Sequence, residues 1–447
     1  MSSEMTRNSP PKRRDSVDQD QFLTILSRED ALARLEAALF PRATPSEMRP
    51  LAAALGCALA ADVVAPIDVP PFDRSNVDGF AVRAADLDGE RECRLTIADR
   101  VAAGHTASAA LKAGAAIRIF TGAPMPAGAD TVFMQEDCRV KDGAVIVPPG
   151  LRRGANTRLA GEDIRAGAVA LPAGRRLAVQ HVALAAALGL AGLAVRRRVR
   201  TAVFSTGDEI VEPGTKLPRA ALYDSNRYLL AGLIARLGAE VTDLGILKDD
   251  RSALASAIAA AAVDHDLVLT SGGVSTGEAD HVRAALESVG RLVFWRLAIK
   301  PGRPVAMGVI RRPHRNPPLQ AGEGREAANG TAFVGLPGNP VAVFVTFVRV
   351  VRPLILRLAG ALPEPLIALS ARAAFSYKKR KGRREYIRVK LRTAPDGVIE
   401  AEKYAQDGAG VLTSLTETDG LAELDEDVTK IEPGAAIGFH SYASLLG

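Results

Sequence analysis

Residues 199 to 358 alternate between short apolar runs and longer segments whose apolar side chains recur at helical spacing, and this alternation limits the possible folds most. Residues 266–269 have the length of a buried strand, for example, whereas residues 281–289 carry apolar side chains three and four positions apart. Strands that alternate with helices predict a parallel sheet with helices on both faces. The carboxyl ends of its strands then lie along one edge, where ligands bind in such sheets.

The turn between these two segments, residues 270–280, has the sequence TSGGVSTGEAD. Its glycines let backbone NH groups approach a ligand, and the following helix offers unpaired NH groups and a partial positive charge. A phosphate or another oxyanion suits such a turn. Glu278 and Asp280 would repel an anion unless a cation lay between them, so the turn indicates a phosphate-plus-magnesium site. A plain tight turn capped by an aspartate is the alternative.

Several other polar or glycine-rich turns also follow predicted strands. They are residues 206–209, 249–250, 300–303 and 335–339. Because the strands belong to one sheet, we expect these turns to converge on one edge and to form a pocket. One or two carboxylates suffice for Mg²⁺, and Lys300 and Arg303 can balance the charge of a phosphate.

The first part of the chain carries different patterns. Residues 28–59 predict helix, interrupted by a proline and resuming at Met48. Residues 70–82 combine two prolines with short polar residues and predict a solvent-exposed turn, with a binding loop as the alternative. Residues 93–147 contain short strands between turns, which indicates a small β domain. Residues 158–195 add a further helix, so we interpret the β domain as an insertion into a mixed first domain.

Composition excludes several classes of protein. A chain of 447 residues with 47% apolar and 24% charged residues is typical of a globular protein with several domains. It contains no long uncharged apolar run, and residues 1–20 predict a disordered tail rather than a signal peptide. The three cysteines follow no metal-ligand spacing and fit a reducing cytoplasm. The net charge is only +6, and a small anionic ligand explains the basic clusters as well as nucleic acid does, so neither a nucleic-acid nor a membrane partner is expected.

With these motifs, the chain resembles the molybdopterin molybdenumtransferase (MoeA) family, which is related to the C-terminal part of gephyrin. No single motif carries the resemblance, because the matching segments follow one another over most of the chain. They are residues 71–75, 77–82, 121–124, 161–163, 205–209, 223–226, 271–280, 298–302 and 335–340.

The resemblance implies an elongated, multidomain α/β plus β subunit. Its implied parts are a tail (1–20), a mixed first domain (21–64 and 159–196), an inserted small β domain (65–158), a parallel α/β molybdopterin-binding domain (197–360, with a flexible insert at 311–329) and a C-terminal β domain (361–447). Members of this family are homodimers. Their active site is built between the α/β and C-terminal domains of one subunit and the inserted domain of the other.

The reaction that the resemblance implies is the insertion of molybdate into adenylylated molybdopterin. Cleavage of the adenylate depends on Mg²⁺ and releases AMP and molybdenum cofactor. A molybdopterin adenylyltransferase is the implied upstream partner. Two alternatives remain open at this point: the chain is itself such an adenylyltransferase, since the Ser-Gly-Gly turn is shared, or it is a non-catalytic carrier or scaffold for the cofactor.

Position by position, the resemblance also implies a set of site residues. The implied catalytic residues are Asp73, Thr121, Glu209, Asp249 and Asp280, of which the last three are also the implied metal ligands. The implied substrate-binding residues are Ser271, Gly272, Gly273, Ser275, Gly277, Arg296, Lys300, Arg303, Pro337, Gly338, Asn339, Arg383 and Ser414. Arg296 and Arg303 stand where lysine is familiar in the family, so a planar guanidinium replaces a point charge at both positions.

Overall fold

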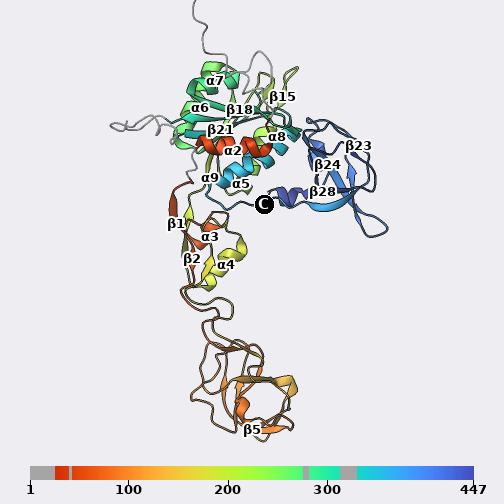
Figure 1. The fold of residues 1–447 in the computed structure, drawn as a ribbon. Helices are drawn as coiled ribbons and strands as arrows, with labels where there is room; N and C mark the ends of the chain where they lie inside the picture. The colour runs from red at the N-terminus through yellow and green to blue at the C-terminus, as the bar shows by residue number, and fades with distance from the viewer. Residues whose placement is uncertain (1–25, 40–42, 275–280, 313–329, 447) are drawn as a thin grey trace, which may run out of the picture. The chain divides into compact units, whose positions relative to one another are not determined.

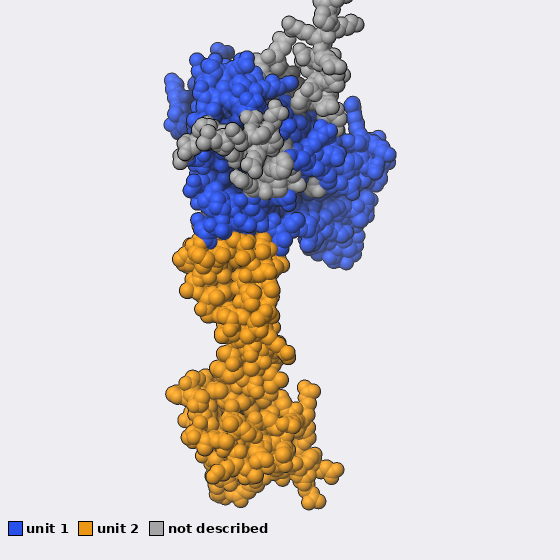
Figure 2. Space-filling model, turned by 60° about the vertical axis from the view of Figure 1, so that its left-hand side comes forward, with its two compact units in different colours: residues 1–47, 56–58, 196–447 blue, residues 48–55, 59–195 orange. Residues whose placement is uncertain are grey.

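The computed structural model describes residues 26–39, 43–274, 281–312 and 330–446 of the chain. The predicted tail at residues 1–20 and most of the predicted insert at residues 311–329 lie outside this range. The chain folds into two compact units, shown in Figure 2. The first unit comprises Met1–Glu47, Gly56–Ala58 and Arg196–Gly447, and the second comprises Met48–Leu55 and Leu59–Val195. The four predicted parts of the subunit stay a prediction within this division.

The first unit contains the predicted α/β sheet, with six strands in the order β16-β13-β17-β21-β20-β18. Their bounds are β13 (Arg200–Thr206), β16 (Glu240–Leu247), β17 (Leu267–Ser271), β18 (Gly290–Arg296), β20 (Pro304–Arg311) and β21 (Gly330–Leu336). The first four strands of this order are parallel, which confirms the predicted α/β class. β20 is antiparallel to both β18 and β21, which the alternation did not predict. The short connection from β18 to β20 cannot make the crossover that a parallel pair requires.

Helices cover both faces of this sheet (Figure 1). In β17, Leu267 and Leu269 belong to one core cluster, and Val268 between them belongs to the other, because successive side chains of a strand point to opposite faces. The first cluster includes side chains of α2 (Arg28–Leu39), α5 (Asn226–Arg236), α8 (Pro340–Thr346) and α9 (Arg352–Leu358). The second includes side chains of α6 (Arg251–Asp264) and α7 (His281–Val289). Burial on both faces explains the apolar runs within the central strands β13, β17 and β21.

The first unit also contains the predicted C-terminal β domain. Its strands are β22 (Leu369–Ala373), β24 (Arg384–Thr393), β25 (Ile399–Lys403), β26 (Gly420–Leu424) and β28 (Ala436–Ser441). Because β24 pairs with both β25 and β26, the sheet closes into a barrel. A sixth strand, β19 (Ile299–Lys300), comes from the α/β domain and pairs with the start of β24. This pairing brings Lys300 against the barrel.

The second unit contains the predicted inserted β domain, a six-stranded sheet in the order β7-β4-β6-β5-β9-β8. The bounds are β4 (Gly79–Val82), β5 (Cys93–Val101), β6 (Ala115–Ile119), β7 (Thr131–Met134), β8 (Arg139–Lys141) and β9 (Ala144–Val147). One prediction is wrong here, since residues 79–82 are a buried strand rather than part of a solvent-exposed turn. The polar residues just before Gly79 favour a loop prediction, although the four residues that follow form an apolar strand that pairs with β6 on one side and β7 on the other.

The prediction that the helix resumes at Met48 is also wrong. The chain there forms a short strand, β1 (Ser46–Pro50), and only one helical turn, α3 (Leu51–Ala54). Pro50 lacks an NH and fits the start of a helix but not its interior. The further helix predicted for residues 158–195 is present as α4 (Val179–Ala187). Within the described part of the chain, no helix is long and apolar enough to cross a membrane.

Candidate functional site

A cavity of about 430 Å³ lies where β13, β17 and β21 end, at the edge of the sheet predicted to bind ligands. We call it the strand-end cavity. Its lining includes Ser205 and Thr206 from β13, Ser271 at the end of β17 with Gly272 after it, and the segment after β21. Other lining residues are Glu209, Asn226, Gly338 and Asn339. The structure therefore brings together polar residues that are far apart in the sequence.

Glycine is required in the turn after β17. Gly272 has a φ of +89°, and a Cβ there would lie 2.3 Å from the carbonyl oxygen of Thr206. Gly273 has a φ of +68°, and a Cβ there would lie 2.4 Å from Cγ2 of Val282. Only glycine permits both the left-handed backbone and this close approach of two strand ends. Ser275, Gly277 and Asp280, which the sequence analysis also assigned to the site, lie outside the described residues.

Asn226 ties the loops of the strand-end cavity together. Its Nδ2 donates to Oγ of Ser271 at 2.9 Å and to the carbonyl oxygen of Gly338 at 2.7 Å. Ser271 Oγ in turn donates to the carbonyl oxygen of Pro337 at 3.2 Å. Asn226 Oδ1 and Ser205 Oγ are buried and have no partner among the described residues. An unpaired buried polar atom costs about 1–3 kcal/mol, so a polar ligand here would offset that cost.

Two of the three implied metal ligands follow neighbouring strands, Glu209 after β13 and Asp249 after β16. Oδ1 of Asp249 accepts a hydrogen bond from Oγ1 of Thr206 at 3.3 Å. Glu209 lines the strand-end cavity, with its carboxylate close to Gly207. The described residues contain no group of three or more His, Cys, Asp or Glu that could hold a metal. Mg²⁺ takes one or two protein carboxylates and completes its shell with water and phosphate oxygens, so the carboxylate of Glu209, which lines the cavity, suits the ion.

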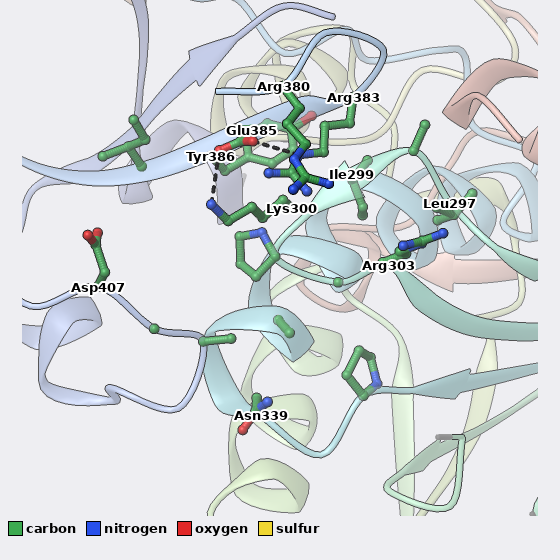
Figure 3. A pocket seen from close by; sticks show the side chains of 18 of the residues that line it. Leu297, Ile299, Lys300, Arg303, Asn339, Arg380, Arg383, Glu385, Tyr386 and Asp407 are labelled. Atoms are coloured by element: carbon green, nitrogen blue, oxygen red, sulfur yellow. Dashed lines mark hydrogen bonds and ion pairs between the residues drawn. The ribbon is translucent and has the colours of Figure 1, made fainter. Parts of the chain in front are cut away.

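A second cavity, of about 580 Å³, lies between the turn after β18 and the barrel strand β24 (Figure 3). We call it the basic pocket, because seven cationic side chains and two carboxylates line it. The cationic residues are Lys300, Arg303, Arg380, Lys381, Arg383, Arg388 and Lys403, and the carboxylates are Glu385 and Asp407. An excess of positive charge in a concave site attracts anions.

Glu385 organises two of these cations. Its carboxylate is 1% exposed and accepts hydrogen bonds from Nζ of Lys300 at 3.2 Å and Nε of Arg383 at 2.7 Å, as Figure 3 shows. Tyr377 Oη donates to the same carboxylate at 2.7 Å and accepts from Lys300 at 3.1 Å.

The pKa values of this pair favour the charged forms. Burial lowers the pKa of Lys300, but the hydrogen bond to Tyr377 and the charge of Glu385 outweigh burial and raise it. Burial raises the pKa of Glu385, but the hydrogen bonds from Tyr377 and Arg383 and the charge of Lys300 lower it overall. Lys300 is therefore a fixed cation at neutral pH. No sequence pattern indicates Glu385, because it meets Lys300 only through the pairing of β19 with β24.

Arg388 is a buried cation of the basic pocket that sequence reasoning also missed. Its Nε donates to Oγ of Ser414 at 3.0 Å, and its Nη2 donates to the carbonyl oxygen of Gly408 at 3.0 Å. Burial lowers the pKa of Arg388. Ser414 itself is 0% exposed and does not line the pocket, so it contacts the lining through Arg388.

The remaining predicted residues are divided between the cavities and the second unit. Asn339 lines both cavities, whereas Arg296 lines neither. In the second unit, Oδ1 of Asp73 accepts from the NH of Ala160 at 2.7 Å. Thr121 donates from its NH and Oγ1 to Oδ1 of Asp78 at 2.8 and 2.7 Å. These hydrogen bonds lower the pKa of Asp78.

Three family models match the chain in order. They are the MoeA N-terminal region (domain I and II) over residues 26–189, the probable molybdopterin binding domain over residues 202–357, and the MoeA C-terminal region (domain IV) over residues 370–441. Together they cover both units.

Whole-length relatives agree with these models. A Haemophilus influenzae protein named molybdopterin molybdenumtransferase is 35% identical over 415 residues, which are 92% of this chain and 97% of the relative. A Nostoc protein of the same name is 36% identical over 396 residues, 87% of each chain. A solved structure of a molybdopterin biosynthesis MoeA protein from Pyrococcus horikoshii has a TM-score of 0.76 and 28% identity, covering 94% of this chain and all (100%) of that one.

Proposed function

The chain belongs to the molybdopterin molybdenumtransferase family, and from this membership we propose that it is the transferase that inserts molybdenum during molybdenum cofactor biosynthesis. The substrates that we propose are molybdate and adenylylated molybdopterin. Cleavage of the adenylate then releases AMP and the finished cofactor. The observation that carries this proposal is the pair of cavities that share Asn339, one polar and built on a glycine turn, the other strongly basic.

The physical task of such an enzyme is to hold its two substrates in reacting positions. Molybdate and the phosphate of the substrate are both anions, and bringing them together costs electrostatic repulsion. The dithiolene of molybdopterin supplies the sulfur ligands, so no cysteine of the chain has to act as nucleophile. Fixed cations in a concave, partly dehydrated site offset the repulsion and hold both anions in reacting positions. Lys300 and Arg383 suit this role, because Glu385 holds both side chains in place.

We assign the residues of the strand-end cavity to the phosphate and the metal. Ser271, Gly272 and Gly273 would bind the phosphate together with Ser275 and Gly277, and Pro337, Gly338 and Asn339 would close the site. Glu209 and Asp249, with Asp280, would hold Mg²⁺ or its water rather than molybdate, because a carboxylate repels an oxyanion. Mg²⁺, when bound, neutralises phosphate charge.

The other assignments are carried by the family alone. Arg296, Arg303 and Ser414 would serve the anionic substrates, Ser414 through its hydrogen bond to Arg388. Asp73 and Thr121 would be contributed by the inserted β domain in a homodimer. We also propose a cytoplasmic location, which the free thiols of Cys57, Cys93 and Cys138 support. A molybdopterin adenylyltransferase would supply the substrate.

The test is an anaerobic incubation of the purified protein with adenylylated molybdopterin, with and without molybdate and Mg²⁺. We expect AMP release that needs both. The variant Asp280→Ala should release no AMP while keeping its fold, and release at the wild-type rate would refute the metal role. Consumption of ATP in place of AMP release would identify an adenylyltransferase, and cofactor binding without any release would identify a carrier.

A further inference from the structure

The inserted β domain has a cavity of its own, of about 750 Å³, on one face of its sheet. Its lining comes from β4, β5, β6 and the segment around β8, and includes neither Asp73 nor Thr121. We call it the arginine pocket. The lining residues are Phe80, Ile97, Ala98, Asp99, Arg100, Arg118, Gln135 and Val140.

Aromatic rings hold the two arginines of this pocket. Cζ of Arg118 lies 4.9 Å from the ring centroid of Phe80 and 5.1 Å from that of Phe120. Cζ of Arg100 lies 4.8 Å from the same Phe120 ring. These distances are those of cation–π contacts, which leave guanidinium NH groups able to donate hydrogen bonds. Arg118 uses one of them to donate from Nη2 to Oε1 of Gln135, a neutral amide.

The pocket lining carries two arginines and one carboxylate, so its net charge is positive. Among the described residues, neither Arg100 nor Arg118 forms a salt bridge. Asp99 is the carboxylate of the lining, and its oxygens accept hydrogen bonds from residues of its own loop. They accept from the NH and Oγ of Ser108 at 2.9 and 2.8 Å and from the NH of Arg100 at 2.7 Å. The hydrogen bonds from Ser108 lower the pKa of Asp99.

We propose that the arginine pocket binds a nucleoside monophosphate. Guanidinium NH groups match phosphate oxygens in a bidentate geometry, and the cation–π contacts hold both guanidinium groups close to the rings. Ile97 and Val140 supply an apolar wall against which a flat base can lie. The volume is within the range of about 300–1,000 Å³ that small-molecule sites occupy. The choice of adenosine as the nucleoside rests on the proposed function, in which AMP is the leaving product. The assignment of a phosphate site to the two arginines does not rest on the proposed function.

The test is titration of AMP into the full-length chain, with adenosine and inorganic phosphate as separate ligands. We expect Arg118→Gln and Arg100→Gln each to weaken AMP binding about tenfold or more, because each removes a charge-assisted phosphate contact. Phe120→Leu should weaken it as well, since Phe120 contacts both arginines. The control is Arg139→Gln, which removes an exposed arginine of the same domain that pairs with Glu92 and should leave the affinity unchanged. Thermal unfolding of each variant shows that the fold is retained.

Photolabelling then locates the site. With 8-azido-AMP we expect label on peptides within residues 79–147, lost in Arg118→Gln and kept in Arg139→Gln. AMP affinity equal to that of the wild type in both arginine-pocket variants, or label only outside residues 79–147, would overturn the proposal. Inorganic phosphate binding as tightly as AMP would overturn the nucleoside part. Failure of the proposed function has a different signature, because the wild-type chain would then release no AMP in the molybdate-dependent assay, whatever the titration gives.

Discussion

Loss of the Glu423 carboxylate should weaken the first unit strongly. It lies on β26 of the barrel, and its Oε2 accepts hydrogen bonds from Nη2 of Arg349 and, at 2.6 Å, from Nε2 of His440. Arg384 Nη1 donates to its Oε1 at 2.7 Å. Arg349 belongs to the π-helical segment Phe347–Val351 between α8 and α9, so this cluster joins the α/β domain to the barrel. The side chain of Arg349 is only 5% exposed.

Two estimates of the stability that the Glu423 carboxylate contributes agree. Burial raises the pKa of Glu423, but the hydrogen bond from His440 and the charges of Arg349 and Arg384 outweigh it and lower the pKa from 4.5 to about 2. That difference corresponds to about 3 kcal/mol of stability, or about 2–3 kcal/mol when the remaining solvent contact of the carboxylate is allowed for. Breaking a buried ion pair by removing one partner costs about 3–5 kcal/mol. Glu423→Gln should therefore lower the free energy of unfolding at pH 7 by about 3 kcal/mol.

The same change should alter the pH dependence. A carboxyl group whose pKa is lowered on folding stabilises fully above its unfolded pKa of 4.5, and this stabilisation is lost as the pH falls towards about 2. The difference between the wild type and Glu423→Gln should then shrink steadily between these two pH values. Urea unfolding followed by circular dichroism at several pH values measures it. A loss below about 1 kcal/mol at pH 7, or a difference that persists unchanged at pH 3, would refute the reasoning. Glu402→Gln, at an exposed ion pair with Arg392, is the matched control and should cost less than about 1 kcal/mol.

Three further predictions concern the two cavities. In steady-state assays, Lys300→Ala should slow molybdate-dependent AMP release by about 10²-fold or more, because a fixed cation facing the anion is lost. An unchanged rate would mean that Lys300 does not belong to the site. Gly272→Ala should lower the free energy of unfolding in urea by at least about 1–3 kcal/mol, since the residue has a φ of +89° and the new Cβ would lie 2.3 Å from the carbonyl oxygen of Thr206. An unchanged free energy of unfolding would mean that the turn can rearrange. Chelation with EDTA should abolish AMP release and added Mg²⁺ should restore it, whereas activity that survives chelation would contradict a divalent-cation requirement.

The α/β domain was predictable because its strands are buried on both faces. Residues 267–269 are apolar and buried within such a strand, and the helical spacing at residues 281–289 corresponds to a helix in the structure. Residues 79–82 were not predictable from the same kind of evidence. They are equally buried, but the polar loop before them hides a strand of only four residues.

The candidate site was predictable only where chain topology places residues together. Parallel strands bring Ser271 and Gly338 to one edge, and the sequence pattern already predicts parallel strands. Contacts between distant elements gave no such signal. Lys300 meets Glu385 because a two-residue strand pairs with the barrel, and Arg388 is held by Ser414 inside it. Asn226 lies in a motif of the family, but its role in joining two loops follows only from the structure.

The most direct test of the proposed function compares two products of one reaction. Purified protein is incubated anaerobically with adenylylated molybdopterin, molybdate and Mg²⁺, and AMP is measured alongside the molybdenum that becomes bound to the pterin. The account predicts that both products appear in equal amounts and that neither forms without molybdate. AMP release without molybdenum incorporation, or incorporation without AMP release, would contradict it.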